Sequence, residues 1–313
     1  MKKDLLVEKR ILMLADPAYS ENDEDFGEKF ILKKEIGNGY IQKIIVGSSI
    51  HIMISQYALK RDTILKRPKK EGLSGSKNII TFSFRNVKNK PSVMVSSADM
   101  DLEITTLADT FTSNIIITVH ADFLKGLIDN NKADSLWKTI IDGKKPFIYE
   151  ELGSSEIQIS AISMIEAKNP KELSHFYYRI KSEELIFLFF KLFLKRKEVQ
   201  NYPLNESDIK RIYQIRDRIA ADLTIIPNLS ELVKLHSISE SKMQRIFKQI
   251  FGNTIYNYHQ YLRIREAARL LKEDKISVSE VGYHLNFSNM SHFSRVFKKY
   301  MGENPKKYSL NNI

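Results

Sequence analysis

Two pairs of basic side chains recur fifty residues apart in the last quarter of the chain. Arg245 and Lys248 are matched by Arg295 and Lys298. An arginine can donate two hydrogen bonds to the N7 and O6 atoms of one guanine, whereas a lysine more often contacts phosphate without reading sequence. These residue types at matched positions indicate contact with duplex nucleic acid.

The residues around these pairs suit the same chemistry. Asparagine and glutamine can bond adenine as arginine bonds guanine, and each such pair contributes ~1–3 kcal/mol of discrimination. A solvated helix face is the ordinary interpretation of such residues, and for a single helix it would be preferred. Because the pattern occurs twice, we predict that the whole set contacts DNA, although His292 could equally lie in solvent beside a helix cap and Ser294 could serve only packing. The set is Ser241, Lys242, Gln244, Arg245 and Lys248 in the first copy, and Asn289, Ser291, His292, Ser294, Arg295 and Lys298 in the second.

An internal repeat positions these residues. Its copies are residues 229–252 and 278–302, and each predicts a short helix, a tight turn and a second helix. In both second helices apolar residues recur at i, i+3, i+4, i+7 and i+8, and a glycine follows, Gly252 or Gly302. This is the plan of a helix-turn-helix (HTH) unit, whose second helix is the recognition helix that enters the major groove.

Polar residues mark the start of each predicted helix. Asn228 and Ser277 both precede a first turn with glutamate three residues on, which is the capping-box arrangement or close to it. Ser239 and Ser288 close the two turns, and we expect them to cap the recognition helices.

A single long helix is predicted between the two copies, over residues 254–272. At 1.5 Å per residue it would span ~28 Å. That length suits two HTH units in successive major-groove segments, which recur every ~34 Å. We expect Arg263, Arg265 and Arg269 to lie on its outward face.

The positive charge is concentrated in the same region. The whole chain carries +11, and residues 208–313 hold 18 Lys and Arg against 10 Asp and Glu, a net of +8. Such an excess fits a polyanion, since each neutralised phosphate releases a condensed counterion. An anionic membrane surface and a nonspecific or architectural DNA-binding role stay open as alternatives, and the latter would give a steep salt dependence with no sequence preference.

The first 200 residues have a different texture. Short runs rich in Ile, Val, Thr and Phe predict strands, and their spacing predicts a sandwich or a barrel. The strands are expected at 40–46, 50–57, 79–84, 102–106 and 114–119, and weaker helical patterns cover 121–130 and 132–141.

A better-marked helix follows, with Ser182 expected as its N-cap and apolar residues almost all round up to Leu194. It must be covered on more than one side, so it is a core helix, which we favour, or a subunit contact. The polar, Pro203-containing segment 197–205 then predicts the boundary between a sensing and dimerisation domain, 1–200, and a DNA-binding domain, 201–313.

Several other functions are disfavoured. The chain has no cysteine, which removes disulfides, thiolate zinc sites and cysteine nucleophiles. His51 and His120 are far apart in sequence, so we expect no metal, no cofactor and no enzyme activity. Charged residues at 8–10 interrupt the apolar N-terminus too early for a secretion signal, and the most apolar stretch, 185–194, is too short to span a bilayer. We expect a soluble, cytoplasmic protein.

Residues 208–310 resemble the AraC/XylS family of regulators. The matching segments are QRIFK at 244–248, YLRIR at 261–265, AARLL at 267–271 and FSNMSHFSRVFKK at 287–299, followed by Gly302, Pro305 and Tyr308. Two turns depart from the family pattern, because Ser237 and Asn286 stand where glycine is usual. Asn tolerates a positive φ better than Ser, so the geometry of the first turn is the less certain. Val233 and Gly282 stand where alanine is usual.

The resemblance implies an α+β multidomain protein, with an N-terminal mostly-β, cupin-like sensing domain with helices and a C-terminal all-α domain with two HTH units. It implies double-stranded DNA and RNA polymerase as partners, a small-molecule effector, dimerisation through the N-terminal helices to form a homodimer, and activation rather than repression. The alkylation-repair proteins that share this domain work through cysteines, which are absent here. Residues 177–185 also resemble a segment of the siderophore-responsive branch typified by the pyochelin regulator, which implies a siderophore-like effector.

Overall fold

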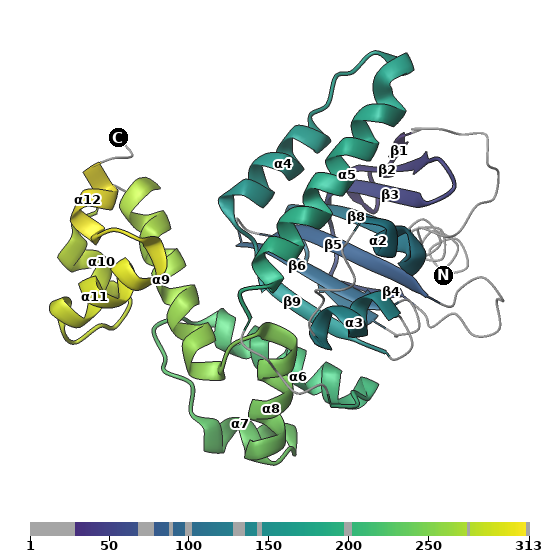
Figure 1. Cartoon of the computed structure of the whole chain (residues 1–313). Helices are drawn as coiled ribbons and strands as arrows, with labels where there is room; N and C mark the ends of the chain where they lie inside the picture. Colours follow the sequence, from purple (N-terminus) through teal and green to yellow (C-terminus); the bar gives the residue numbers. More distant parts are fainter. Residues whose placement is uncertain are drawn as a thin grey trace. The chain divides into compact units, whose positions relative to one another are not determined.

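A computed structural model describes residues 29–67, 78–87, 90–97, 102–127, 135–142, 146–196, 202–273 and 276–310. The chain separates into two compact units, Met1–Glu206 and Ser207–Ile313, coloured purple to teal and green to yellow in Figure 1. The charged residues 8–10 and residues 197–201 of the predicted boundary lie outside the described residues.

The first unit is mostly β with helices, as predicted. Its strands form a seven-stranded antiparallel sheet in the order β1-β2-β3-β8-β5-β6-β9, and β4 pairs separately with β7. The layer packed on one face of the large sheet is helical rather than a second large sheet. The strands are β1 (Lys29–Ile31), β2 (Gly37–Val46), β3 (Ile50–Leu59), β4 (Thr63–Arg67), β5 (Ile79–Val87), β6 (Lys90–Ser97), β7 (Leu102–Thr106), β8 (Thr112–His120) and β9 (Ile148–Leu152).

Helix α5 (Lys171–Phe193) supplies much of the core. Alternate strand residues face it, and the ring of Phe82 on β5 lies 5.4 Å from that of Phe189 and 5.8 Å from that of Phe190. The predicted core role of this helix is therefore confirmed. The described part of this unit also contains the shorter helices α2 (Ala121–Leu127), α3 (Ser135–Asp142) and α4 (Ser155–Ile165), the last of which was not predicted.

The predicted start of α5 was wrong. It begins at Lys171 after the N-cap residue Pro170, and Ser182 lies buried in mid-helix. The charged run that suggested a helix start instead forms surface ion pairs one turn apart, such as Arg179 with Glu183 at 3.0 Å. Four residues of a helix surface and the first turn of a new helix have the same composition, so sequence could not separate them.

The opposite face of the large sheet contains several buried polar residues. Its side chains alternate along the strands with those that contact α5, and they are buried. Ser83 Oγ donates to Asn114 Oδ1 at 3.0 Å across the β5–β8 pair. Met53, Met94 and Ile148 also lie on this face, and its buried polar residues are Ser55, Thr81, Ser83, Ser96, Asn114, Thr118 and Glu150.

The second unit is all α, also as predicted. Phe247, Phe251 and Tyr258 form an aromatic cluster in its first half, with ring centroids 4.6–5.4 Å apart. Among the described helices of either unit, none combines the length and apolar character required to cross a membrane. The helices are α6 (Glu206–Ala221), α7 (Leu229–His236), α8 (Glu240–Phe251), α9 (Ile255–Glu273), α10 (Val278–His284), α11 (Met290–Met301) and α12 (Pro305–Leu310).

Candidate nucleic-acid interface

The first HTH unit consists of α7 and α8. The Asn228 side chain caps α7 by accepting a hydrogen bond from the Glu231 backbone N–H at 3.3 Å. The helix ends at Ser237, whose φ of 48° and ψ of 51° are left-handed. Helix α8 then buries its apolar face and ends at Gly252, with φ of 68°. The turn glycine usual in this position is thus replaced by a serine in the same left-handed conformation.

The second HTH unit, α10 and α11, repeats these features. Ser277 and Glu280 form a full capping box at the start of α10. The turn contains Asn286 at φ 59°, and α11 ends at Gly302 with φ of 84°. The predicted repeat of cap, positive-φ turn, recognition helix and glycine end is present in both units.

The caps of the recognition helices differ from the prediction. Ser239 occupies the N-cap position of α8 without a side-chain hydrogen bond, and α11 is capped by Asn289 rather than Ser288. The Asn289 oxygen Oδ1 accepts from the His292 backbone N–H at 3.0 Å. The extra residue of the second copy moves the cap by one position, so the Asn289 oxygen accepts a hydrogen bond at the helix end while its amide nitrogen takes no part in that bond.

Most of the predicted contact residues lie on the outer faces of α8 and α11. The basic pairs Arg245 with Lys248 and Arg295 with Lys298 are exposed at equivalent positions. Exposed with them are Ser241, Asn289 and Ser291, and half-buried are Lys242, Gln244, His292 and Ser294.

Two residues of the set have surroundings that sequence did not indicate. Lys242 Nζ lies 2.8 Å from Asp208 Oδ2, so this lysine joins α8 to α6. The Gln244 oxygen Oε1 is buried and lacks a hydrogen-bond partner within the described part of the chain.

The outward position predicted for Arg263 was wrong. This α9 side chain is 2% exposed, and its Nε donates to the Leu285 carbonyl at the end of α10 at 3.2 Å. Its guanidinium lies 3.8 Å from the centre of the Phe287 ring. Burial lowers the Arg263 pKa from its ordinary value. A helical periodicity cannot reveal this arrangement, because the main partner is a backbone carbonyl in another helix.

The other two arginines of α9 are half-buried and engaged locally. Arg265 Nη1 donates to the Tyr261 hydroxyl at 3.3 Å, and Arg269 Nη2 donates to Glu266 Oε1 at 2.9 Å. The prediction placed both side chains on the outward face, whereas each is half-buried and bonded to a neighbour on α9.

Comparison with known proteins places this geometry in a family. A helix-turn-helix domain family matches residues 232–311. The probable transcription factor PqrA of Proteus vulgaris is 32% identical over 98 residues, which cover 31% of this chain and 75% of that protein. The arabinose operon regulatory protein of Escherichia coli is 29% identical over 121 residues, covering 37% of this chain and 40% of that protein. The chain belongs to the AraC family of transcription regulators.

The similarity to other AraC-family members covers only part of their length. The transcriptional activator RhaR of Mannheimia succiniciproducens is 28% identical over 159 residues, covering 51% of this chain and 55% of that protein. The chain thus spans about half the length or less of the first curated relatives it matches. Among solved structures, a probable AraC family regulator from Rhodopseudomonas palustris is similar, with a TM-score of 0.31 and 22% identity over 33% of this chain and 97% of that one.

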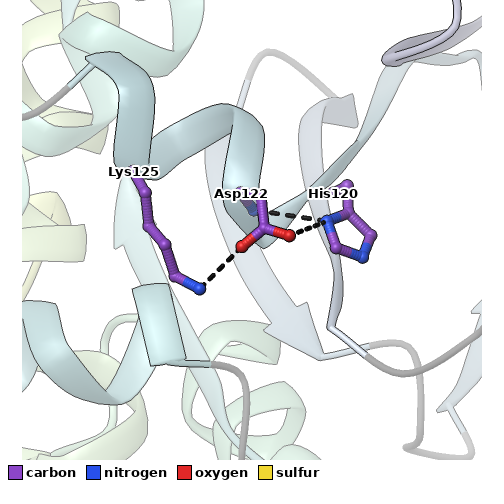
Figure 2. Close-up of polar contacts among 3 residues, drawn as sticks. All are labelled: His120, Asp122 and Lys125. Carbon is purple, nitrogen blue, oxygen red and sulfur yellow. Dashed lines mark hydrogen bonds and ion pairs between the residues drawn. The ribbon is translucent and has the colours of Figure 1, made fainter.

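The histidines considered as metal ligands are nearer to each other than their sequence separation suggested. His51 pairs with Thr118 across the β3–β8 register, which places His120 on the same face of the neighbouring strand. Figure 2 shows the surroundings of His120: its Nδ1 lies 3.2 Å from Asp122 Oδ2, and Lys125 Nζ lies 2.7 Å from Asp122 Oδ1. These exposed contacts sit at the start of α2, and within the described residues no group of three or more His, Asp or Glu could hold a metal ion.

Within this AraC-family domain, the bonding partners of Arg263 and Asn286 were not predicted from the sequence. Asn286 Nδ2 donates to the Thr224 carbonyl at 3.0 Å, across a separation of 62 residues. The signal in the sequence was the replacement of the usual turn glycine by Asn286, which bears on backbone conformation and does not by itself indicate the bond to Thr224.

Proposed function

We propose that the chain regulates transcription by binding a promoter-proximal DNA site through α8 and α11, one recognition helix in each of two successive major-groove segments. The observation that carries the proposal is the exposure of Arg245 with Lys248 and of Arg295 with Lys298 at equivalent positions of two matched HTH units. In this assignment the arginines read bases and the lysines contact phosphate.

The remaining contacts divide by their surroundings. Ser241, Ser291, His292 and Ser294 are proposed to contact DNA at the ends and flanks of the two helices, while Asn289 contributes through its amide N–H groups. Gln244 reads a base only after its buried oxygen turns outward. Lys242 is the weakest member, because its ammonium is already paired with Asp208. No catalytic role is part of the proposal.

The first unit is proposed to sense a small-molecule effector. Support comes from the buried polar residues of the opposite sheet face, where Thr118 Oγ1 is buried with no hydrogen-bond partner among the described residues, beside the Ser83–Asn114 bond. An unpaired buried hydroxyl is costly and suits a ligand that completes its hydrogen bonding. The siderophore-like effector stays a prediction, because the segment that suggested it lies within α5, where Tyr178, Ser182 and Leu185 are buried in the core.

A homodimer is proposed to form through α5. One stripe of this helix is apolar and exposed, although another face of the helix packs in the core. Its members recur at intervals of three, four and seven residues, which is the spacing of a helix-packing seam. They are Leu173 at 55%, Phe176 at 65%, Ile180 at 47% and Phe187 at 64% exposure. Effector binding would then alter dimerisation or domain contact, and contact with RNA polymerase would activate transcription.

The test is selection of binding sites from a random duplex library by the full-length chain, with the fragment 201–313 in parallel. Enrichment of a bipartite motif with two boxes about one helical turn apart is expected. Recovery of DNA without an enriched motif, together with loss of binding at moderate salt, would contradict the proposal and favour the nonspecific, architectural binder.

A further inference from the structure

The loop at 222–224, which leads into the first HTH unit, is bonded to the turn of the second. Asn286 Nδ2 donates to the Thr224 carbonyl at 3.0 Å. The loop is itself held by Asp222, whose Oδ1 accepts from the Thr224 backbone N–H at 2.9 Å and from its hydroxyl at 2.6 Å. The carbonyl that receives the Asn286 amide is therefore fixed in place by a local side-chain turn.

Helix α9 also contacts this turn. Besides its bonds to the Leu285 carbonyl, Arg263 stacks on Phe287, whose ring lies 5.0 Å from that of Phe293 in α11. The carbonyl of Leu285 belongs to the C-terminal end of α10, where a cation is favoured by the helix dipole and fills an unsatisfied acceptor. One arginine thus joins α9 to the end of α10 directly and to α11 through the Phe287 ring.

The two sets of contacts meet at consecutive residues. Leu285 and Phe287 are contacted by Arg263 of α9. Asn286 between them is bonded to the 222–224 loop, which leads into the first HTH unit. We name these contacts, made by Asp222, Thr224, Arg263 and residues 285–287, the junction. Without the junction, the two HTH units would be connected mainly through α9. One HTH unit could then rotate relative to the other about this helix.

We infer that the junction fixes the distance and rotational phase between the two recognition helices, so that Asn286 and Arg263 are positioning residues that set the spacing of the two DNA boxes. This inference rests on the proposed function. One added base pair displaces the second box by about 3.4 Å and turns it by about one tenth of a helical turn. A rigid pair of HTH units rejects that change, whereas a loosely joined pair accepts it.

The decisive variant is Asn286→Gly in the full-length chain. Glycine accepts the positive φ of Asn286, so the turn is kept and only the amide is lost. The matched control is Ser237→Gly, the same kind of change in the equivalent turn of the first HTH unit. Within the described chain, Ser237 makes no side-chain hydrogen bond to the second HTH unit.

Affinity would be measured on the selected bipartite site and on duplexes with one to four base pairs inserted between the boxes. Wild type and Ser237→Gly should show a sharp optimum at the selected spacing. For Asn286→Gly we expect about fivefold weaker binding at the optimum, as for loss of one hydrogen bond, and a shallower fall on insertion. Unchanged affinity for a single box would separate this effect from damage to the recognition helix.

A second variant tests the same bond from its other end. Asp222→Ala releases the loop that presents the Thr224 carbonyl, and the double variant should be no worse than the more affected single one, since both remove one interaction. Arg263→Lys keeps the charge but loses the planar stack on Phe287. It should further broaden the range of box spacings that the protein binds. An unaltered, sharp spacing optimum in Asn286→Gly and Asp222→Ala would overturn the inference, whereas absence of any bipartite site for wild type would instead contradict the proposed function.

Discussion

Lys242 Nζ on the first recognition helix lies 2.8 Å from Asp208 Oδ2 on α6, and the aspartate side chain is 3% exposed. A carboxylate so far removed from water needs a cation, because an unpaired buried charge is strongly unfavourable. The lysine therefore contributes to the stability of the fold at a position that sequence assigned to DNA.

Lys242→Ala should lower the free energy of unfolding more than it lowers DNA affinity. The expected loss is about 1–2 kcal/mol, reduced from that of a fully buried pair because Lys242 is 39% exposed. Lys248→Ala is the matched control and should leave stability within about 0.5 kcal/mol while weakening DNA binding. Urea denaturation and DNA titration of both variants would measure this, and equal stability of the two would contradict the structural role of the ion pair.

Arg295→Ala and Lys298→Ala should have different effects on specificity. Loss of a base-reading arginine should cost ~1–3 kcal/mol on the preferred site and relax the preference at one base position. Loss of a phosphate-contacting lysine should weaken all sequences alike and reduce the salt slope by about 1. Competition binding with single-base variants of the selected site distinguishes them, and sequence-blind losses from both would refute the assigned roles.

Ser237→Gly should stabilise the protein by about 0.5–1 kcal/mol. The left-handed conformation of Ser237, with φ of 48°, strains a side-chain-bearing residue but not glycine, and this gain exceeds the entropy that glycine adds to the unfolded chain. Asn286→Gly should gain less or lose stability, because asparagine tolerates this region and its amide is bonded to Thr224. Thermal unfolding of both variants provides the measurement, and a lower melting temperature for Ser237→Gly would show that its turn is not strained.

Stability should fall on acidification through His259. This α9 histidine is fully buried, and burial, reinforced by the charge of Arg263, lowers its pKa from 6.5 to about 4, while the Leu223 backbone and Asp222 act in the opposite direction. The folded state therefore favours the neutral imidazole of His259. The contribution of this group to the free energy of unfolding is full above pH 6.5 and is lost as the pH falls from 6.5 toward 4. The loss should reach about 3 kcal/mol. Denaturation at a series of pH values would test this, and His259→Gln should show a flatter dependence across this interval.

Phe176→Glu and Phe187→Glu should shift the chain toward the monomer. A charge on the exposed stripe of α5 would have to be buried in the proposed dimer contact. Phe111→Glu, at a residue 58% exposed in the segment before β8, is the control and should leave association unchanged. Sedimentation equilibrium gives the association constant, and equal behaviour of all three variants would exclude α5 as the contact.

The sequence by itself determined the two HTH units. Their signals are local: the caps at Asn228 and Ser277, the glycines at 252 and 302, and apolar residues at helical spacing all act on neighbours within one or two turns. Strands β2, β3, β5, β7 and β8 were likewise visible as β-branched runs between turn residues.

Only the tertiary structure decided which polar side chains remain available on those helices. Lys242 is paired with a residue of α6, Arg263 with a carbonyl 22 residues away, and Asn286 with one 62 residues away. The true start of α5 was hidden for a related reason, since charged residues that pair along a helix surface resemble a helix N-terminus. Periodicity shows which face of a helix is polar, but a polar side chain can bond backbone atoms of any segment that folding brings beside it, and that choice is not encoded in its immediate neighbours.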